Sequence, residues 1–421
     1  MTRYMAPAAT LLAGCIIACR GADPGDTSSG DTTSDPGTPG AGGSGDDVQP
    51  PPPPVSYGGG TLVGGDHGYF PKTVSKSDAE SAYETFRSDY VESCGENGLR
   101  VVTRADETMS EGIGHGALLA VGWDDKDTFD GLLTYYQKAV AVTDAAKSTK
   151  HGLMGWLVWA DPCSFQQVYT GASSAADLNM AMALLQAECR WGGSDYYHAA
   201  IRIIDSVRKF MTAEMPEGTA LLPSDMGEHE GCMNASYSAP GFYRVFAEAQ
   251  PEQAPFWNKM ADDHYVFLEL AADDSTGFVG DWAPIGSSVC DGSTTYVGYD
   301  AIRTHWRAST DYVWFGTPAA KSWLEKVTGW VDVEVGSEKL VDMQDGFFSD
   351  GSELLGDPNE ANSAFLGAVA VGAIPVSQKA SDVYHEIFRE VPPANDDDYY
   401  SVTARALYLM LSVNKFSPGC Y

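Results

Sequence analysis

The segment Met109–Gly116 reads Met-Ser-Glu-Gly-Ile-Gly-His-Gly and sets one acidic side chain, Glu111, among glycines. An apolar run with helical spacing begins directly after it, so we expect Glu111 in the first turn of a helix. Glycines remove side-chain bulk and let a large substrate approach the backbone. A glutamate in a partly dry cleft can stay protonated and act as an acid. The alternative is that Glu111 only balances the positive end of the helix dipole.

A second acidic side chain, Asp300, stands three residues before Arg303 in the segment Val297–Arg307. This spacing puts both side chains on one face of a helix. The cation is expected to keep the aspartate ionised and to help fix a water molecule. An ionised carboxylate beside a fixed water is a candidate general base. The alternative is a local ion pair on a helix surface.

Several motifs, taken in order over residues 75–415, resemble glycoside hydrolase family 8, which includes endoglucanases, xylanases, lichenases and chitosanases. The first motif resembles the family's Ser-Glu-Gly-x-Gly-Tyr-Gly, and the last resembles its Tyr-Asp-Ala-x-Arg-x-Pro-Trp-Arg. The motifs are Ser110–Gly116, Gly152–Trp156, Ser173–Ala181, Asn234–Tyr237 and Tyr299–Arg307.

The resemblance implies hydrolysis of a glycosidic bond with inversion, inside an (α/α)6 barrel. It assigns Glu111 as general acid and Asp300 as general base, and inversion places two such carboxyl groups about 6.5–9.5 Å apart. It also implies that Tyr237 and Arg303 hold the attacking water and that Trp156 stacks on a sugar ring. Without the resemblance, Tyr237 and Trp156 also fit as ordinary core side chains.

The chain departs from the family's pattern at the motif Ala-Ser/Thr-Asp-Ala/Gly-Asp. Asp177 matches the second aspartate and is expected to bind substrate, or else to cap or cross-link a buried helix end. Ala175 replaces the first aspartate, which contacts the distorted sugar. Losing that carboxylate is expected to cost about a few kcal/mol of transition-state binding. Met226 replaces a stacking tryptophan, and His115 replaces a tyrosine.

These departures leave two further hypotheses open. One is a surface polysaccharide-binding protein that is catalytically weakened or inactive. The other is a helical scaffold without a sugar site, in which Glu111 and Asp300 do not face each other across a cleft.

Apolar side chains at helical spacing recur along the folded region and predict about twelve helices separated by long loops. Ser77–Glu80 reads as a capping box ahead of the first of them. Six helical hairpins in a barrel fit this count, so the expected fold class is all-α. A helix count alone does not exclude a solenoid. Clear examples are the stripes Tyr83, Phe86 and Tyr90; Phe129, Leu132 and Tyr136; and Met180, Leu184 and Trp191.

The amino terminus reads as an export signal over residues 1–19, with Arg3 followed by an apolar run. Cys19 ends a lipobox-like stretch and is the expected lipidation site, with Cys15 as the alternative; an ordinary secretory signal is also open. Residues 20–56 form a linker rich in Gly, Ser, Asp and Pro that cannot bury a core. The catalytic domain is expected at residues 57–421, lipid-anchored at the outer surface or in the periplasm, or otherwise secreted.

The formal charge of −32 argues against nucleic acid or an anionic membrane as a partner of the folded surface. We expect a polysaccharide partner, a monomer, and membrane contact only through the lipid. Cellulose or another β-1,4-linked glucan is the first expectation, and xylan or chitosan are alternatives. No cofactor or metal is expected, because the cysteines lack zinc spacing and the histidines do not cluster. Six cysteines follow the signal, some of which are expected to pair, but the sequence does not choose the pairing.

Overall fold

The computed structural model describes residues 60–421, except 228–230, 286–287, 289, 291–292, 357–361 and 394–397. The expected signal peptide, the Cys19 and Cys15 alternatives and the linker of residues 20–56 lie outside the described residues. Within the described part, no helix has the length and apolar character needed to cross a membrane.

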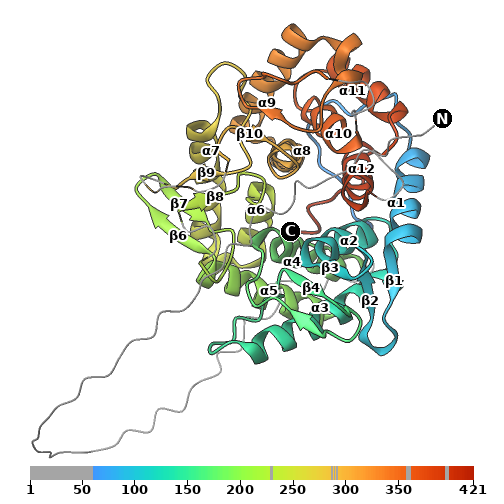
Figure 1. Ribbon diagram of the computed structural model, residues 1–421, viewed down its shortest axis with the longest axis vertical. Coiled ribbons are helices and arrows are strands. Elements are labelled where there is room, and N and C mark those ends of the chain that lie inside the picture. Colours follow the sequence, from blue (N-terminus) through green and yellow to red (C-terminus); the bar gives the residue numbers. More distant parts are fainter. Residues whose placement is uncertain are drawn as a thin grey trace, which may run out of the picture. The chain divides into compact units, whose positions relative to one another are not determined.

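Six helices form a closed inner ring in which each contacts the next and the last returns to the first (Figure 1). Nearly every side chain of α2, α4, α10 and α12 is buried, as expected of helices that are covered on all sides. The inner helices are α2 (Ser110–Gly122), α4 (Ser174–Trp191), α6 (Pro240–Ala249), α8 (Thr304–Phe315), α10 (Ser363–Gly372) and α12 (Tyr399–Ser412).

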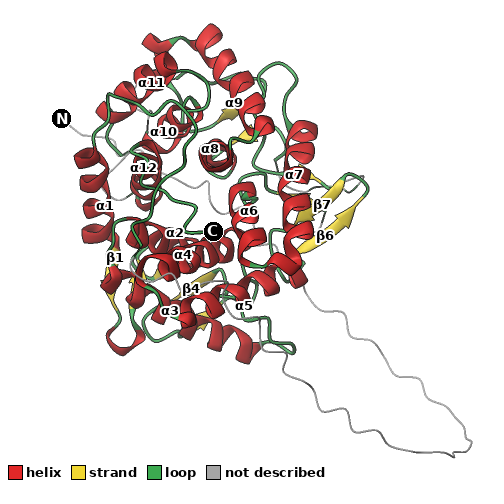
Figure 2. Cartoon of the chain, turned by 180° about the vertical axis from the view of Figure 1, so that it is seen from behind, coloured by secondary structure: helices red, strands yellow, loops and turns green. Residues whose placement is uncertain are grey.

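Six outer helices each pack on one inner helix, with α1 on α12, α3 on α2, α5 on α4, α7 on α6, α9 on α8 and α11 on α10 (Figure 2). The described residues therefore form an (α/α)6 barrel, as the sequence predicts. The contact of α12 with α2 closes the ring and excludes a solenoid. The outer helices are α1 (Lys76–Tyr90), α3 (Lys126–Ala146), α5 (Ser194–Phe210), α7 (Ala254–Ala271), α9 (Pro318–Trp330) and α11 (Gln378–Glu390).

The first helix begins two residues earlier than the capping box that the sequence suggests. Ser75 is the N-cap: its hydroxyl accepts from the Asp78 N–H at 3.2 Å, and Asp78 accepts from the Ser75 N–H at 2.7 Å. The prediction of Ser77–Glu80 was wrong because Ser77 lies inside the helix, and Asp78, rather than a glutamate, completes the box with Ser75.

Short antiparallel strands and single helical turns occupy the loops. The sheet that matters for the site joins β3 (Glu107–Met109), β4 (Leu157–Trp159) and β5 (Gln167–Val168). The other pairs are β1 (Val91–Ser93) with β2 (Leu99–Val101), β6 (Thr212–Met215) with β7 (Gly218–Leu221), β8 (Cys232–Met233) with β9 (Ala283–Pro284), and β10 (Tyr296–Val297) with β11 (Phe347–Phe348). The turns are η1 (Gly95–Asn97), η2 (Pro251–Gln253), η3 (Ala301–Arg303), the π-helical η4 (Val331–Val335) and η5 (Ser337–Asp342).

The C-terminal segment enters the inner ring, and the chain end lies among the inner helices in both views (Figures 1 and 2). Phe416 is buried, stacks on Trp306 with 5.7 Å between ring centroids, and accepts a 3.0 Å hydrogen bond from the Trp314 indole. A disulfide between Cys189 and Cys420 fixes the segment to α4.

All six cysteines of the folded region are paired. The pairs, between which the sequence did not choose, are Cys94–Cys163, Cys189–Cys420 and Cys232–Cys290.

Candidate active site

Glu111 lies in the first turn of α2, directly after β3. The Ser110 N–H donates to the Trp156 carbonyl at 2.9 Å, so the sheet fixes the start of the helix. The Glu111 side chain is 22% exposed and therefore reaches the surface from a mostly enclosed position.

Arg303 joins Glu111 to Asp300. Its Nη1 contacts Glu111 Oε1, and its Nη2 contacts Asp300 Oδ1. The guanidinium is almost fully buried, whereas the Asp300 side chain is 35% exposed. Two carboxyl groups that are far apart in the chain thus meet at one cation, and both keep a path to solvent.

Tyr237 packs against the same guanidinium. The Arg303 Cζ lies 5.6 Å from the Tyr237 ring centroid and 5.7 Å from that of Tyr400. Burial, followed by the negative charges of Asp300 and Asp281, raises the pKa of Tyr237 well above its ordinary value. The hydroxyl therefore stays protonated and can donate a hydrogen bond. The structure thus brings Tyr237 together with Glu111, Asp300 and Arg303.

Asp281 is a further acidic residue of this site, and the sequence reasoning did not find it. Its Oδ1 accepts from the N–H groups of Gly298, at 2.9 Å, and Ala301, at 2.8 Å, on either side of Asp300. Burial, with a smaller effect of the Asp281 charge, raises the pKa of Asp300 to about 7. The expected ion pair of Asp300 with Arg303 forms, while burial acts on the Asp300 pKa in the opposite direction.

Trp156 is half-buried beside the start of α2 and meets Tyr169 edge to face, with 5.5 Å between ring centroids. Tyr169 is 37% exposed. The two rings offer an aromatic surface next to Glu111, and such a surface suits the C–H face of a sugar ring.

Asp177 has no exposed surface, which corrects the expectation that it binds substrate. Its Oδ1 accepts from the Tyr136 hydroxyl and from the Met154 N–H at 3.5 Å. It therefore cross-links the first turn of α4 to α3 and to the loop before Trp156, the structural alternative considered above. Burial raises the pKa of Asp177 to about 8. Ala175 is also completely buried.

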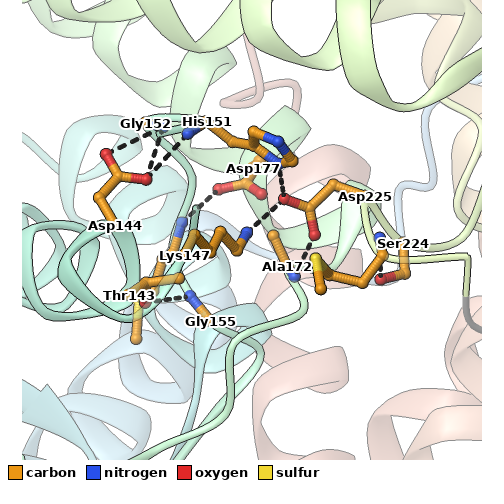
Figure 3. A network of polar contacts seen from close by, with 12 residues as sticks. Thr143, Asp144, Lys147, His151, Gly152, Gly155, Ala172, Asp177, Ser224 and Asp225 are labelled. Carbon is orange, nitrogen blue, oxygen red and sulfur yellow. Dashed lines mark hydrogen bonds and ion pairs between the residues drawn. The ribbon is translucent and has the colours of Figure 1, made fainter. Parts of the chain in front are cut away.

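Asp225 forms the centre of a buried polar cluster that the sequence reasoning missed (Figure 3). Its Oδ2 contacts Lys147 Nζ and lies 2.6 Å from His151 Nδ1, while its Oδ1 accepts from the Ala172 N–H at 2.8 Å. The Asp225 side chain is fully buried and that of Lys147 nearly so. The cluster ties the loop after α3 to the residues that enter α4, whereas the neighbouring Met226 is half exposed.

The arrangement can perform acid–base chemistry on a bound substrate. One carboxyl group lies at a helix start beside an aromatic surface, and a second lies across a shared guanidinium beside a protonated tyrosine. A proton donor and a proton acceptor are thus held near each other, which is what bond cleavage by an activated water needs.

Comparison with known proteins gives the chain a family. A family model described as glycosyl hydrolases family 8 matches residues 69–414. Endoglucanase 2 of Ruminiclostridium josui is 28% identical over 349 residues, which are 81% of this chain and 72% of that protein. Endoglucanase A of Acetivibrio thermocellus is 28% identical over 359 residues, covering 81% of this chain and 71% of that protein.

Solved structures share the fold. The apo structure of a β-1,3-1,4-glucanase from Paenibacillus sp. X4 superposes with a TM-score of 0.73 at 19% identity, covering 86% of this chain and 99% of that chain. A reducing-end-xylose releasing exo-oligoxylanase in complex with xylose superposes with a TM-score of 0.68 at 18% identity, over 82% of this chain and 95% of that one. The matched family model spans most of the chain, and the chain belongs to glycosyl hydrolases family 8.

Proposed function

We propose that this glycoside hydrolase cleaves a β-1,4-linked polysaccharide internally and with inversion. Glu111 protonates the leaving glycosidic oxygen, and Asp300 takes a proton from the water that attacks the anomeric carbon from the opposite face. Tyr237 and Arg303 hold that water. The observation that carries the proposal is the contact of one guanidinium with both carboxyl groups. The names of the endoglucanase relatives favour a β-glucan, with xylan or chitosan as alternatives.

The proposal is tested by Glu111→Gln and Asp300→Asn, which keep the size of each side chain. Each is expected to lower the release of reducing sugar by about a hundred- to ten-thousandfold. Glu107→Gln, on the strand that precedes Glu111, is the matched control and should stay active. Near-full activity of either site variant contradicts the assignment, and nuclear magnetic resonance of the first-formed anomer tests inversion.

A second candidate is a polysaccharide-binding protein with weakened or lost catalysis, which Ala175 in place of the family's aspartate favours. Calorimetry with oligosaccharides and a long hydrolysis assay on cellulose, xylan, lichenan and chitosan separate the two. Binding without cleavage supports the second candidate. A large gain in turnover by Ala175→Asp identifies a weakened enzyme.

We also propose export, lipidation at Cys19 and a monomeric catalytic domain on a flexible tether. The apolar run before Cys19 and the composition of residues 20–56 support this. The two variants Cys19→Ala and Cys15→Ala are expressed and fractionated. Only the variant that lacks the lipidated cysteine, expected to be Cys19→Ala, should leave the membrane fraction. Gel filtration tests the monomer.

A further inference from the structure

A small cavity inside the inner ring is lined in part by Arg303. Its volume is about 10 Å³, room for one water-sized group. The walls come from α2, α8 and α12, together with Arg303 itself. The lining residues used below are His115, Arg303, Trp306 and Tyr408.

Each of these four side chains carries a buried polar atom that has no hydrogen-bond partner among the described residues. The atoms are Arg303 Nε, Trp306 Nε1, His115 Nε2 and the Tyr408 hydroxyl. All four residues are at most 3% exposed. Buried polar groups rarely lack partners, and leaving one unsatisfied costs about 1–3 kcal/mol. Four residues with such atoms line one cavity, and this combination points to a polar binding site.

The chemistry of the four atoms defines the guest. Arg303 Nε and Trp306 Nε1 can only donate, so the guest must accept two hydrogen bonds. Burial lowers the pKa of His115 to about 3, so the imidazole is neutral and one ring nitrogen can accept. The Tyr408 oxygen can also accept. A molecule that accepts two hydrogen bonds and donates two has the hydrogen-bonding capacity of water, whereas a halide ion needs donors only.

We propose that the cavity binds one water molecule, which accepts from Arg303 and Trp306 and donates to His115 and Tyr408. Through this water, His115 and Tyr408 are positioning residues for the guanidinium that contacts Glu111 and Asp300. His115 is the position where the family motif has tyrosine, so the proposal also gives this departure a physical role. The catalytic consequence rests on the proposed function, but the binding site does not.

Crystallography of the whole protein in bromide buffer tests the site directly. We expect an oxygen-sized peak in the cavity, within hydrogen-bond distance of the four atoms, and no anomalous signal there. An anomalous peak would show that the cavity takes a halide, and an empty cavity would show that it takes nothing; either result overturns the proposal.

Tyr408→Phe tests the positioning role, because it removes one hydroxyl and keeps the ring. Its kcat should fall by about ten- to a hundredfold with KM unchanged, since Arg303 loses its fixed orientation. The matched control is Tyr197→Phe, which removes a buried hydroxyl from α5 that donates to the Ala249 carbonyl at 3.0 Å. Equal kcat values for the two variants, at comparable melting temperatures, contradict the role.

His115→Gln is a second variant, in which the amide oxygen can replace the imidazole acceptor. It should retain more of the wild-type kcat than His115→Leu, which removes the acceptor; equal losses contradict the proposal. If the wild type hydrolyses no polysaccharide, the proposed function fails while crystallography still decides the water site.

Discussion

Arg303 sets the electrostatics of the site, because its buried guanidinium contacts the carboxyl groups of Glu111 and Asp300. One positive charge faces two negative ones, and Asp281 adds a third acidic group behind Asp300. A site with surplus negative charge favours protonation of one of its carboxyl groups. That is the condition under which one acid and one base coexist at the same pH.

The raised pKa of Asp300 predicts the pH dependence of the reaction. A general base acts when it has lost its proton, so kcat/KM should rise with pH through about 7. Asp281→Asn removes a negative charge near Asp300 and lowers its pKa, so the acidic limb should move to lower pH. The asparagine oxygen can still accept from Gly298 and Ala301.

The matched control for this shift is Asp345→Asn. Asp345 accepts a 2.9 Å hydrogen bond from the Tyr299 hydroxyl, next to Asp300 in the chain, and does not contribute to the Asp300 pKa. The acidic limb of the kcat/KM profile of this variant should stay at the wild-type pH. A limb that is unmoved in Asp281→Asn, or moved upward, contradicts the electrostatic role.

Asp177 predicts a pH dependence of stability. Its pKa rises from an ordinary value of 3.8 to about 8 on folding, so its neutral form is the one that the fold accommodates. Its contribution is fully present below about pH 4 and is lost as the pH rises to about 8. Asp177→Asn should remove this slope and gain on the order of a few kcal/mol relative to wild type between these limits.

Urea unfolding of both proteins at pH 5 and pH 8 measures this difference. The advantage of the asparagine variant should be larger at pH 8. An equal difference in unfolding free energy at the two pH values would show that Asp177 is ionised and paired in the folded state.

At the residue level, motif order anticipates that Glu111, Asp300, Arg303 and Tyr237 belong to one site. The sequence could not show that the Asp177 side chain is fully buried, because helical periodicity indicates on which face of a helix a residue lies but not what packs against that face. Contacts between distant segments, such as that of Asp225 with Lys147, leave no local pattern. The departure at Met226 lies next to Asp225 in the chain but gives no sign of that cluster.

Among the elements, the sheet of β3, β4 and β5 places the start of α2 beside Trp156. Gly155, just before β4, lies so close to β5 that an added Cβ would stand 1.8 Å from the Tyr169 carbonyl oxygen. The backbone there cannot yield without separating the strands.

Gly155→Ala should therefore lower the free energy of unfolding by about 1–3 kcal/mol and reduce activity, because Trp156 and the start of α2 shift with the strand. Gly329→Ala is the matched control: its Cβ would meet no atom of the described residues within 4 Å, and the change should be neutral or stabilising by up to about 1 kcal/mol. Urea unfolding and a hydrolysis assay on both variants measure the contrast. Equal unfolding free energies and equal activities of the two variants would mean that the strands adjust to the added methyl group.

The helices were predictable because each carries a long apolar stripe, and nearly every side chain of α2, α4, α10 and α12 is buried. The strands were not, because elements of two to four residues have too little length to show a period of two. The closure of the ring depends on the contact of α12 with α2, which no local pattern encodes.

For the molecule as a whole, the C-terminal segment is held in the inner ring by Phe416 and by the disulfide between Cys189 and Cys420, which spans 231 residues. Cross-links over long loops restrict the unfolded chain most in the chain-entropy model. Cys189→Ser with Cys420→Ser should lower the free energy of unfolding by about 2–5 kcal/mol. Thermal unfolding under oxidising conditions measures it.

The control pair is Cys94→Ser with Cys163→Ser, which opens a loop of 69 residues. It should cost somewhat less, because loop entropy grows slowly with length. Unchanged stability of the first variant would show that packing of Phe416 alone holds the segment.

The outer helix α1 packs on α12, so the first helix of the barrel packs on the last one. Before α12 has been synthesised, the ring is incomplete. The apolar surfaces at its two open ends, which α12 covers in the finished barrel, are then exposed. Prematurely terminated chains that lack α12 leave this apolar surface exposed and are expected to aggregate or be degraded. The ring can therefore close only after α12 has been synthesised.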